Sequence, residues 1–160
     1  MPLITRIELQ LQTGEQSGAG TDGDVYLGLC GREFYIDSSK DDFGRGTSRT
    51  YIFGDENSDR NVEHADFNDP TTHYLRTENL EKFPVYIRFH PLGSNPRADR
   101  WQLERADVYL NGSEVYEWST FGIVRGLGIW LGTHAGLVVH LARHIDPIPP
   151  RPPVKGELAS

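Results

Sequence analysis

The chain of 160 residues contains a single cysteine, Cys30, so no disulfide can form within it. One cysteine is typical of a reducing compartment, or of a fold that needs no disulfide because its hydrophobic core is large enough. Seven Tyr, seven Phe and three Trp supply large side chains for such a core. The length fits one domain built around one core.

Basic residues are too few to balance the acidic ones. The chain has 16 Lys and Arg against 23 Asp and Glu, which gives a formal net charge of -7. Nucleic-acid binding needs a basic surface that displaces counterions, so the charge argues against that class of partner. An anionic membrane would also repel the chain unless a cation bridged the two.

Long apolar runs are missing too. No stretch approaches the roughly 20 apolar residues of a transmembrane helix. Residues 1–6 also lack the charged segment and apolar run of a signal peptide and instead begin an alternating, strand-like pattern. We therefore expect no membrane span and no cleaved signal peptide, which slightly favours a cytoplasmic protein.

Catalytic motifs are equally absent from the sequence. There is no nucleophile elbow, no phosphate-binding Walker loop and no dinucleotide-binding fingerprint. We expect that this chain is not an enzyme on its own.

Turn-forming residues and short alternating segments are abundant. The 17 Gly and 10 Pro are scattered between segments in which apolar and polar residues alternate, a pattern typical of half-buried strands. Two antiparallel sheets packed through their apolar faces would leave the polar faces in water. The sequence therefore predicts an all-β fold, an antiparallel β-sandwich of about eight strands, with strands near residues 3–11, 25–29, 34–36, 50–53, 85–89, 101–110, 115–118 and 137–141.

Local irregularities in these strands carry further predictions. Leu3 shares the apolar face of the first strand, and Cys30 falls on the outward side of the second. The alternation slips within residues 101–110, and a β-bulge near Glu104 and Arg105 would restore it. Asn111-Gly112 predicts a type I′ hairpin.

The chain divides into a sandwich domain and a tail. Residues 1–144 form the domain, in which the polar segment 54–74 is a surface insertion, and residues 145–160 form a Pro-rich tail. The apolar, Gly-rich stretch 121–132 either packs beneath the sandwich or docks on a protein partner. The tail is either a linker or a ligand for an aromatic groove on a partner, through Pro149, Pro150, Arg151, Pro152 and Pro153.

Acidic residues gather in two loops. Residues 18–24 and 37–42 flank a predicted hairpin, which brings both loops to one end of the sandwich, and a third loop at 95–100 adds Asp99. Clustered carboxylates are tolerated when they are solvated or when a hard cation lies between them. Calcium accepts six to eight oxygen ligands in irregular geometry. The loops are therefore either solvated turns or a calcium site.

The segment Gly18-Ala19-Gly20-Thr21-Asp22-Gly23-Asp24-Val25-Tyr26-Leu27 resembles a signature of PLAT (lipoxygenase-homology) domains, which occur in lipoxygenases, lipases and bacterial phospholipase C toxins. Residues 37–46, 101–108 and 130–131 resemble later family motifs in the same order, so the resemblance covers about residues 3–142. In that family catalysis resides in a separate domain.

The resemblance implies a possible calcium cofactor and a set of ligands for it. The first loop would supply a backbone oxygen of Gly20 and ligands from Thr21 and Asp22. The second and third loops would supply carboxylates, those of Asp37, Asp41, Asp42 and Asp99. The implied function is a non-catalytic, calcium-dependent binding module for lipid, membrane or protein ligands. The alternative is a calcium-independent structural or adaptor protein that docks on a protein partner through its apolar Gly-rich stretch and Pro-rich tail.

Overall fold

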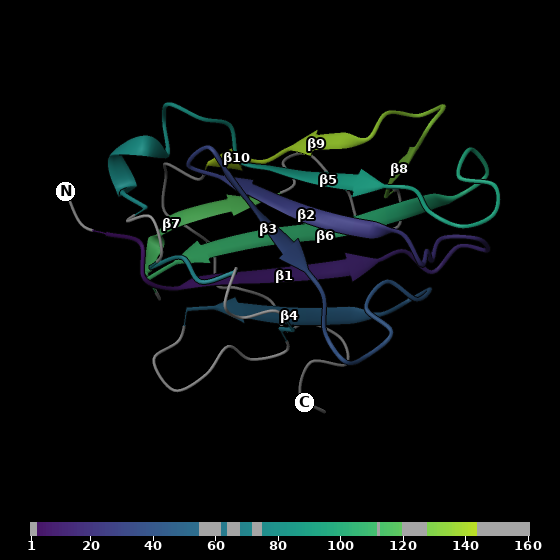
Figure 1. Ribbon diagram of the computed structural model, residues 1–160, viewed down its shortest axis with the longest axis horizontal. Helices are drawn as coiled ribbons and strands as arrows, with labels where there is room; N and C mark the ends of the chain where they lie inside the picture. The colour runs from purple at the N-terminus through teal and green to yellow at the C-terminus, as the bar shows by residue number, and fades with distance from the viewer. Residues whose placement is uncertain are drawn as a thin grey trace.

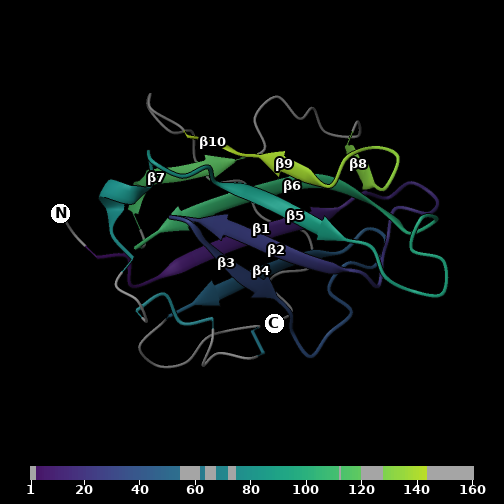
Figure 2. The same ribbon diagram turned by 45° about the horizontal axis from the view of Figure 1, so that its top comes forward.

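The computed structural model describes residues 3–54, 62–63, 68–71, 75–111, 113–119 and 128–143. In this part of the chain, ten strands form two antiparallel sheets that pack face to face (Figure 1). In Figure 2, strands of the smaller sheet lie in front of strands of the larger one. The predicted antiparallel β-sandwich is confirmed.

The larger sheet has six strands. Its order is β10-β7-β6-β1-β4, and β8 pairs with the first half of β6. The strands are β1 (Ile7–Thr13), β4 (Ser48–Phe53), β6 (Arg100–Leu110), β7 (Ser113–Ser119), β8 (Ile129–Gly132) and β10 (Ala142–Arg143).

The smaller sheet has four strands in the order β3-β2-β5-β9. They are β2 (Asp24–Leu29), β3 (Arg32–Ile36), β5 (Tyr86–His90) and β9 (Val138–His140). A short 3-10 helix, η1 (Thr77–Asn79), precedes β5.

The core fills the space between the sheets, where the apolar faces of both meet. Trp101 lies at its centre and is fully buried. Its ring contacts those of Phe43 and Phe89, with centroids 5.4 and 6.0 Å away. Its indole N–H donates a 2.9 Å hydrogen bond to Thr13 Oγ1, so the polar atom of this large side chain is satisfied.

The predicted bulge and hairpin are both present in β6. Gln12 pairs with Arg105 and Thr13 with Leu103, so Glu104 is the extra residue of a β-bulge. The bulge returns the residues on both sides of it to the core-facing side. At the other end of β6, Asn111 has a φ of 54°, as the first position of a type I′ turn requires; Gly112 lies outside the described residues.

The chain changes sheet just after the last predicted strand, because β9 lies within the predicted residues 137–141 and β10 follows them. β9 pairs with β5 in the smaller sheet and β10 pairs with β7 in the larger one. Between them Leu141 is buried in the core, and its N–H donates to Val85 O at 2.8 Å. This change of sheet is one reason why the described residues contain more strands than the alternation predicts.

Two orientations differ from the prediction. Leu3 is 39% exposed whereas Ile4 is fully buried, because β1 begins at Ile7 and the preceding residues do not follow its alternation. Cys30 is buried rather than outward, because with a φ of 54° it forms the β2–β3 turn together with Gly31. Burial raises the pKa of the Cys30 thiol to about 11.

The described residues of the predicted insertion cover the open edge of β3. Asn68 accepts a hydrogen bond from Tyr35 N and donates one to Tyr35 O, each 2.9 Å long, and so acts like a neighbouring strand. Nearby, Glu63 N donates to Asp37 O. An edge strand with unpaired backbone groups is prone to aggregation, and these contacts protect it.

Candidate functional site

The loops between β1 and β2, between β3 and β4, and between β5 and β6 lie at one end of the sandwich, opposite the N-terminus (Figure 1). The first two enclose an open pocket of about 240 Å³. Its lining includes five of the predicted ligands and also Asp24, Tyr35 and Lys40. The lining residues are Thr21, Asp22, Gly23, Asp24, Tyr35, Ile36, Asp37, Lys40, Asp41, Asp42 and Phe43.

Backbone contacts hold the first two loops together. Thr21 N donates to Phe43 O at 3.0 Å. Gly20 packs directly against the second loop, where a Cβ would lie 2.8 Å from Arg45 N. A side chain at position 20 would therefore push the loops apart. Gly20 itself does not line the pocket.

Asp42 organises the second loop. One carboxylate oxygen accepts hydrogen bonds from Ser38 Oγ and from Tyr51 OH (2.8 Å), and the other accepts one from Ser38 N (2.9 Å). Burial, with a further contribution from the Asp42 carboxylate, raises the pKa of Tyr51 far above its usual value, so Tyr51 remains a donor. Three protein donors thus use most of the acceptor capacity of the carboxylate, and only Oδ2, which accepts a single hydrogen bond, keeps a lone pair for another partner.

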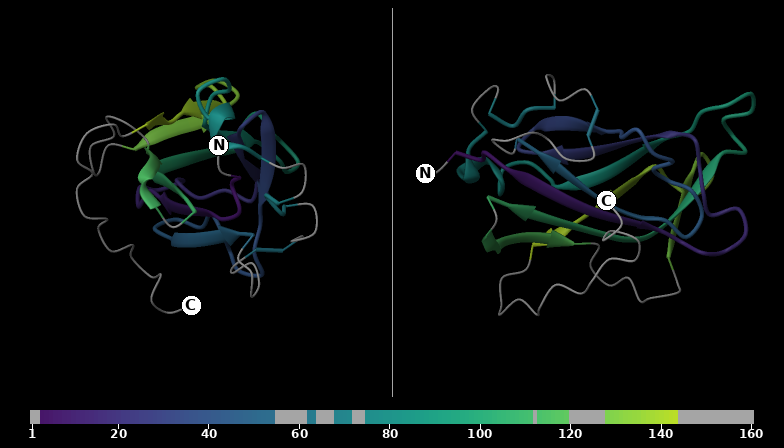
Figure 3. Two further views of the ribbon diagram at one scale, coloured as in Figure 1. Left: turned by 90° about the vertical axis from the view of Figure 1, so that its left-hand side faces the viewer. Right: turned by 90° about the horizontal axis from the view of Figure 1, so that it is seen from below.

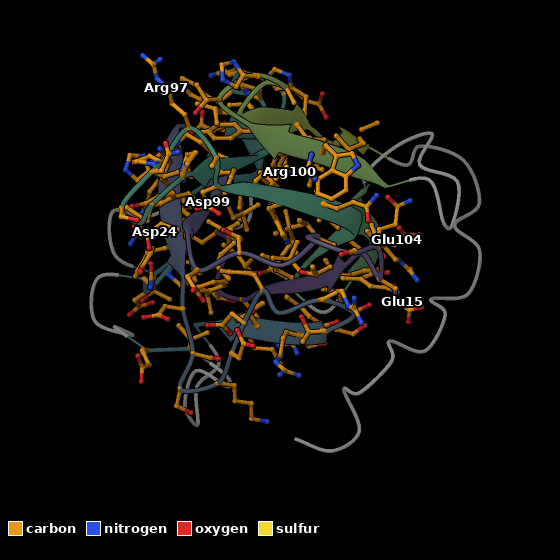
Figure 4. All side chains as sticks on the ribbon, turned by 90° about the vertical axis from the view of Figure 1, so that its right-hand side faces the viewer. Glu15, Asp24, Arg97, Asp99, Arg100 and Glu104 are labelled. Atoms are coloured by element: carbon orange, nitrogen blue, oxygen red, sulfur yellow. The ribbon has the colours of Figure 1, made fainter. Side chains whose placement is uncertain are left out.

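Asp99 joins the third loop to the first. Its Oδ1 accepts a 2.6 Å hydrogen bond from Thr21 Oγ1, and its Oδ2 accepts one from Leu92 N at 2.9 Å. Thr21 Oγ1 in turn accepts from Gly23 N. Figure 4 shows Asp99 and Asp24 at this end of the molecule. The structure places Asp99 next to Thr21 but not in the pocket lining.

Asp24 and Tyr35 are pocket residues that the sequence analysis did not select. Tyr35 OH donates a 2.8 Å hydrogen bond to Asp24 Oδ1. Burial raises the pKa of Tyr35 strongly, and the negative charges of Asp24 and Asp37 raise it further. Asp24 begins β2 and alternates with the core-facing Val25, so the sequence indicates its outward position. Its hydrogen bond with Tyr35 on β3 depends on the register of the two strands, which the sequence does not show.

The donor set of the pocket fits a hard cation. Carboxylate, hydroxyl and phenol oxygens line it, which suits calcium or magnesium rather than zinc. Asp22, Asp37 and Asp41 reach it from both loops. In the described residues, no three His, Cys, Asp or Glu side chains converge closely enough to form a metal-binding group, so these carboxylates are spread around the pocket wall.

Comparison with solved structures identifies the fold. The chain is similar to the alpha toxin of Clostridium absonum and to the alpha toxin of an avian strain of Clostridium perfringens, each with a TM-score of 0.54 and 19% sequence identity. Each match covers 88% of this chain and 32% of the toxin chain. A lipoxygenase in complex with arachidonate matches with a TM-score of 0.50 and 14% identity, over 87% of this chain and 16% of the lipoxygenase chain.

The matched regions are the C-terminal PLAT-like domain of the toxins and the PLAT domain of the lipoxygenase, so this chain has the fold of a PLAT domain. The resemblance inferred from the sequence motifs is confirmed. The chain spans about a third of the length of the toxins and about a sixth of that of the lipoxygenase. No family model matches the sequence, and neither does any curated protein.

Among the described residues, no helix combines the length and the apolar character that crossing a membrane requires.

Proposed function

We propose that this chain is a calcium-dependent binding module. The acidic pocket takes a calcium ion, and the open coordination positions of the ion take an anionic group of a lipid or protein ligand. The observation that carries the proposal is the pocket of about 240 Å³ whose wall contains five aspartates, four from two loops and one from the start of β2.

Asp22, Asp37 and Asp41 would hold the ion together with backbone carbonyls of the two loops. Calcium tolerates irregular arrangements of six to eight oxygens, so it suits carboxylates carried on loops. The ion would remove the repulsion between the carboxylates and draw the loops together. Asp42 and Asp99 would act indirectly, because their hydrogen bonds fix the loops that carry the ligands.

A lipid surface is the ligand class favoured by the surroundings of the pocket. Leu92 and Leu137 are 39% and 38% exposed. Leu92 belongs to the β5–β6 loop at the pocket end, and Leu137 O accepts a hydrogen bond from Phe89 N near the end of β5. Apolar side chains beside a cation site can enter the interfacial layer while the cation contacts phosphate. The cation would also offset the net charge of -7 that opposes binding to an anionic membrane.

In this proposal the chain has no catalytic activity of its own. The PLAT domains that it matches are parts of larger proteins. We propose that the chain binds a ligand or a membrane surface and does not transform a substrate.

The calcium-independent adaptor remains the alternative. Its tail residues 145–160 and most of the stretch 121–132 lie outside the described residues. The described end of that stretch is strand β8, in which Trp130 is half-buried beneath the guanidinium of Arg100, 4.5 Å from the ring centroid. This part favours packing against the sandwich.

The first experiment is a calcium titration followed by thermal unfolding, with magnesium as a control. A ligand that binds the native state raises Tm by mass action. We expect a calcium-specific rise that is lost in D22N/D41N and retained in E78Q, an exposed acid on η1 that serves as the matched control. An equal rise in D22N/D41N would remove the pocket from the proposal.

The second experiment measures the ligand. We expect the chain to sediment with vesicles of phosphatidylcholine and phosphatidylserine in millimolar calcium but not in EDTA. Less of the chain should sediment with vesicles of pure phosphatidylcholine. A calcium-dependent rise in Tm without vesicle binding would direct the search to protein ligands. No rise in Tm at millimolar calcium would contradict the proposal and favour the adaptor.

A further inference from the structure

The two sheets differ in how far their outward faces are exposed. On the six-stranded sheet the outward Glu8 and Gln10 are only 7% and 3% exposed, which corrects the prediction that both polar faces lie in water. The four-stranded sheet packs its apolar face on the larger sheet, and its other face points away from the molecule (Figure 3). The outward side chains of this second face are exposed or half-buried, and Val138 is 43% exposed.

The register of the four strands arranges these outward side chains in three rows across the sheet, each read from β3 towards β9. The first row is Glu33, Gly28, Tyr86 and His140. The second row is Tyr35, Tyr26, Arg88 and Val138. The third row, on β2 and β5 alone, is Asp24 and His90. Both carboxylates of the rows thus lie on β2 and β3, whereas the guanidinium and both imidazoles lie on β5 and β9.

Contacts within the face hold its side chains in place. Arg88 forms an ion pair with Glu33, with 2.7 Å between Nε and Oε2, and its guanidinium lies 4.1 Å from the centroid of the Tyr26 ring. Tyr86 OH donates to the same carboxylate at 2.8 Å. Side chains that are already fixed lose little rotamer freedom when a partner binds. Tyrosine and arginine are also enriched in protein interfaces, so the face has the composition of a binding surface.

We propose that this face binds a second copy of the chain, about a two-fold axis that runs parallel to the strands between β2 and β5. Such an axis reverses each row, so that β2 faces β5 of the partner and β3 faces β9 of the partner. The carboxylate of Glu33 then faces the partner's His140, and that of Asp24 faces the partner's His90. Imidazole N–H groups are donors and carboxylates are acceptors, so these pairs are complementary.

The second row is complementary under the same axis. Tyr26 faces the partner's Arg88, an arrangement in which a guanidinium meets an aromatic ring. Tyr35 faces the partner's Val138, so an aromatic side chain meets an exposed apolar one. Because the interface is isologous, each of these contacts occurs twice.

An in-plane axis perpendicular to the strands does not give this complementarity. An axis of that kind through the second row would place each strand against its own copy. Arg88 would face the partner's Arg88, and the two acidic strands would face the same two strands of the partner. Juxtaposed like charges oppose association. The division of charge between the two pairs of strands therefore selects the axis parallel to them.

The size of the face sets the strength of the dimer. Four strands about 4.8 Å apart and five residues of about 3.3 Å each give a face of roughly 19 by 17 Å. Stable interfaces bury about 800 Å² on each partner, more than a flat face of this size provides. The net charge of -7 on each copy also opposes association. We therefore expect a weak dimer that dissociates on dilution.

The axis has a consequence for the acidic pockets. Rotation about a line parallel to the strands leaves the strand direction unchanged, so both pockets lie at the same end of the dimer. Two calcium sites would then meet one membrane surface together, and the second contact would gain from the effective concentration that the first provides. This consequence rests on the proposed function, whereas the dimer itself requires no calcium.

Sedimentation equilibrium in EDTA tests the dimer apart from the calcium pocket. We expect the average mass of the full chain to rise with concentration from that of one chain towards that of two. H140E sets a carboxylate against the partner's Glu33 and should raise the Kd of the dimer at least ten-fold. H134E, on the exposed β8–β9 turn, makes the same charge change away from the face and should associate like the parent chain.

Disulfide crosslinking tests the axis. Glu33 and His140 lie on the two edge strands of the sheet, so E33C and H140C should crosslink to each other across the interface when mixed and oxidised. We expect this mixed disulfide to form at least ten-fold faster than a disulfide between two copies of either variant. The parent chain, whose Cys30 is buried, provides the background rate.

Three results would overturn the inference. A parent chain that stays monomeric at millimolar concentration would show that the face binds no second copy. Equal association of H140E and H134E would assign the contact to another surface. Mixed disulfides that form no faster than those within each variant would exclude the axis, and this result also decides the question if H140E does not fold.

Discussion

Thr21 Oγ1 donates a 2.6 Å hydrogen bond to Asp99 Oδ1 and thereby joins the first and third loops at the acidic end of the sandwich. The two residues are 78 positions apart in the sequence. Their interaction, together with the bond from Leu92 N to the other carboxylate oxygen, makes Asp99 a part of the loop framework.

The first prediction concerns this pair. A hydrogen bond to a charged acceptor contributes about 1.5–3 kcal/mol, and Thr21 is buried. We expect T21V and D99A each to lower the free energy of unfolding, with a coupling energy of about 1 kcal/mol in a double-mutant cycle followed by urea unfolding. Additive effects of the two substitutions would show that the bond contributes nothing to stability.

Lys40 gives a second prediction, on cation affinity. It is the one ammonium group among the residues that line the acidic pocket. Removing its charge should strengthen cation binding, so we expect K40Q to lower the Kd for calcium several-fold at low ionic strength and less in 0.5 M salt. K82Q, on the exposed segment after η1, is the matched control. Equal affinities of K40Q and the parent chain would place the ion elsewhere.

Glu33 gives a prediction on pH. Hydrogen bonds and charge from Arg88, together with a hydrogen bond from Tyr86, lower the pKa of the Glu33 carboxyl. A lowered pKa in the folded state contributes stability above the unfolded value of about 4.3, and this contribution is lost as the pH falls through the folded value. The ion pair is one-third exposed, so we expect less than about 1 kcal/mol.

The corresponding measurement compares E33Q with the parent chain by urea unfolding. The parent chain should be more stable at pH 6, and the difference should shrink below pH 4. A difference that is constant with pH would show that the carboxylate charge has no part in it.

Asn68 gives a prediction on the sheet edge. Its side chain is 1% exposed and makes both hydrogen bonds to the backbone of Tyr35. We expect N68A to cost about 2 kcal/mol of stability and to increase hydrogen exchange at the Tyr35 amide more than at Leu27, in the interior of the sheet. N79A, on η1, is the control. Unchanged exchange at Tyr35 would mean that the edge needs no cover.

Local sequence patterns determined the fold class and much of its detail. Alternation of apolar and polar residues identifies strands because side chains point to opposite faces of a sheet. The same alternation located the bulge at Glu104, where the face changes within one strand. Asn111 followed by glycine predicted the hairpin, because few residues adopt a positive φ. The acidic loops fell at one end because a hairpin returns the chain to its starting side.

Only the tertiary structure decided how the parts of the site and the sheets relate. The hydrogen bonds that occupy Asp42 and Asp99, and the pairing of Tyr35 with Asp24, depend on contacts between segments that the sequence does not place side by side. The change of sheet at Leu141, between β9 and β10, depends on the strand with which each of them pairs. Gln10 is buried, although alternation places it on the outer face of the sheet. Alternation distinguishes the two faces of a strand but does not show whether the outer face is covered.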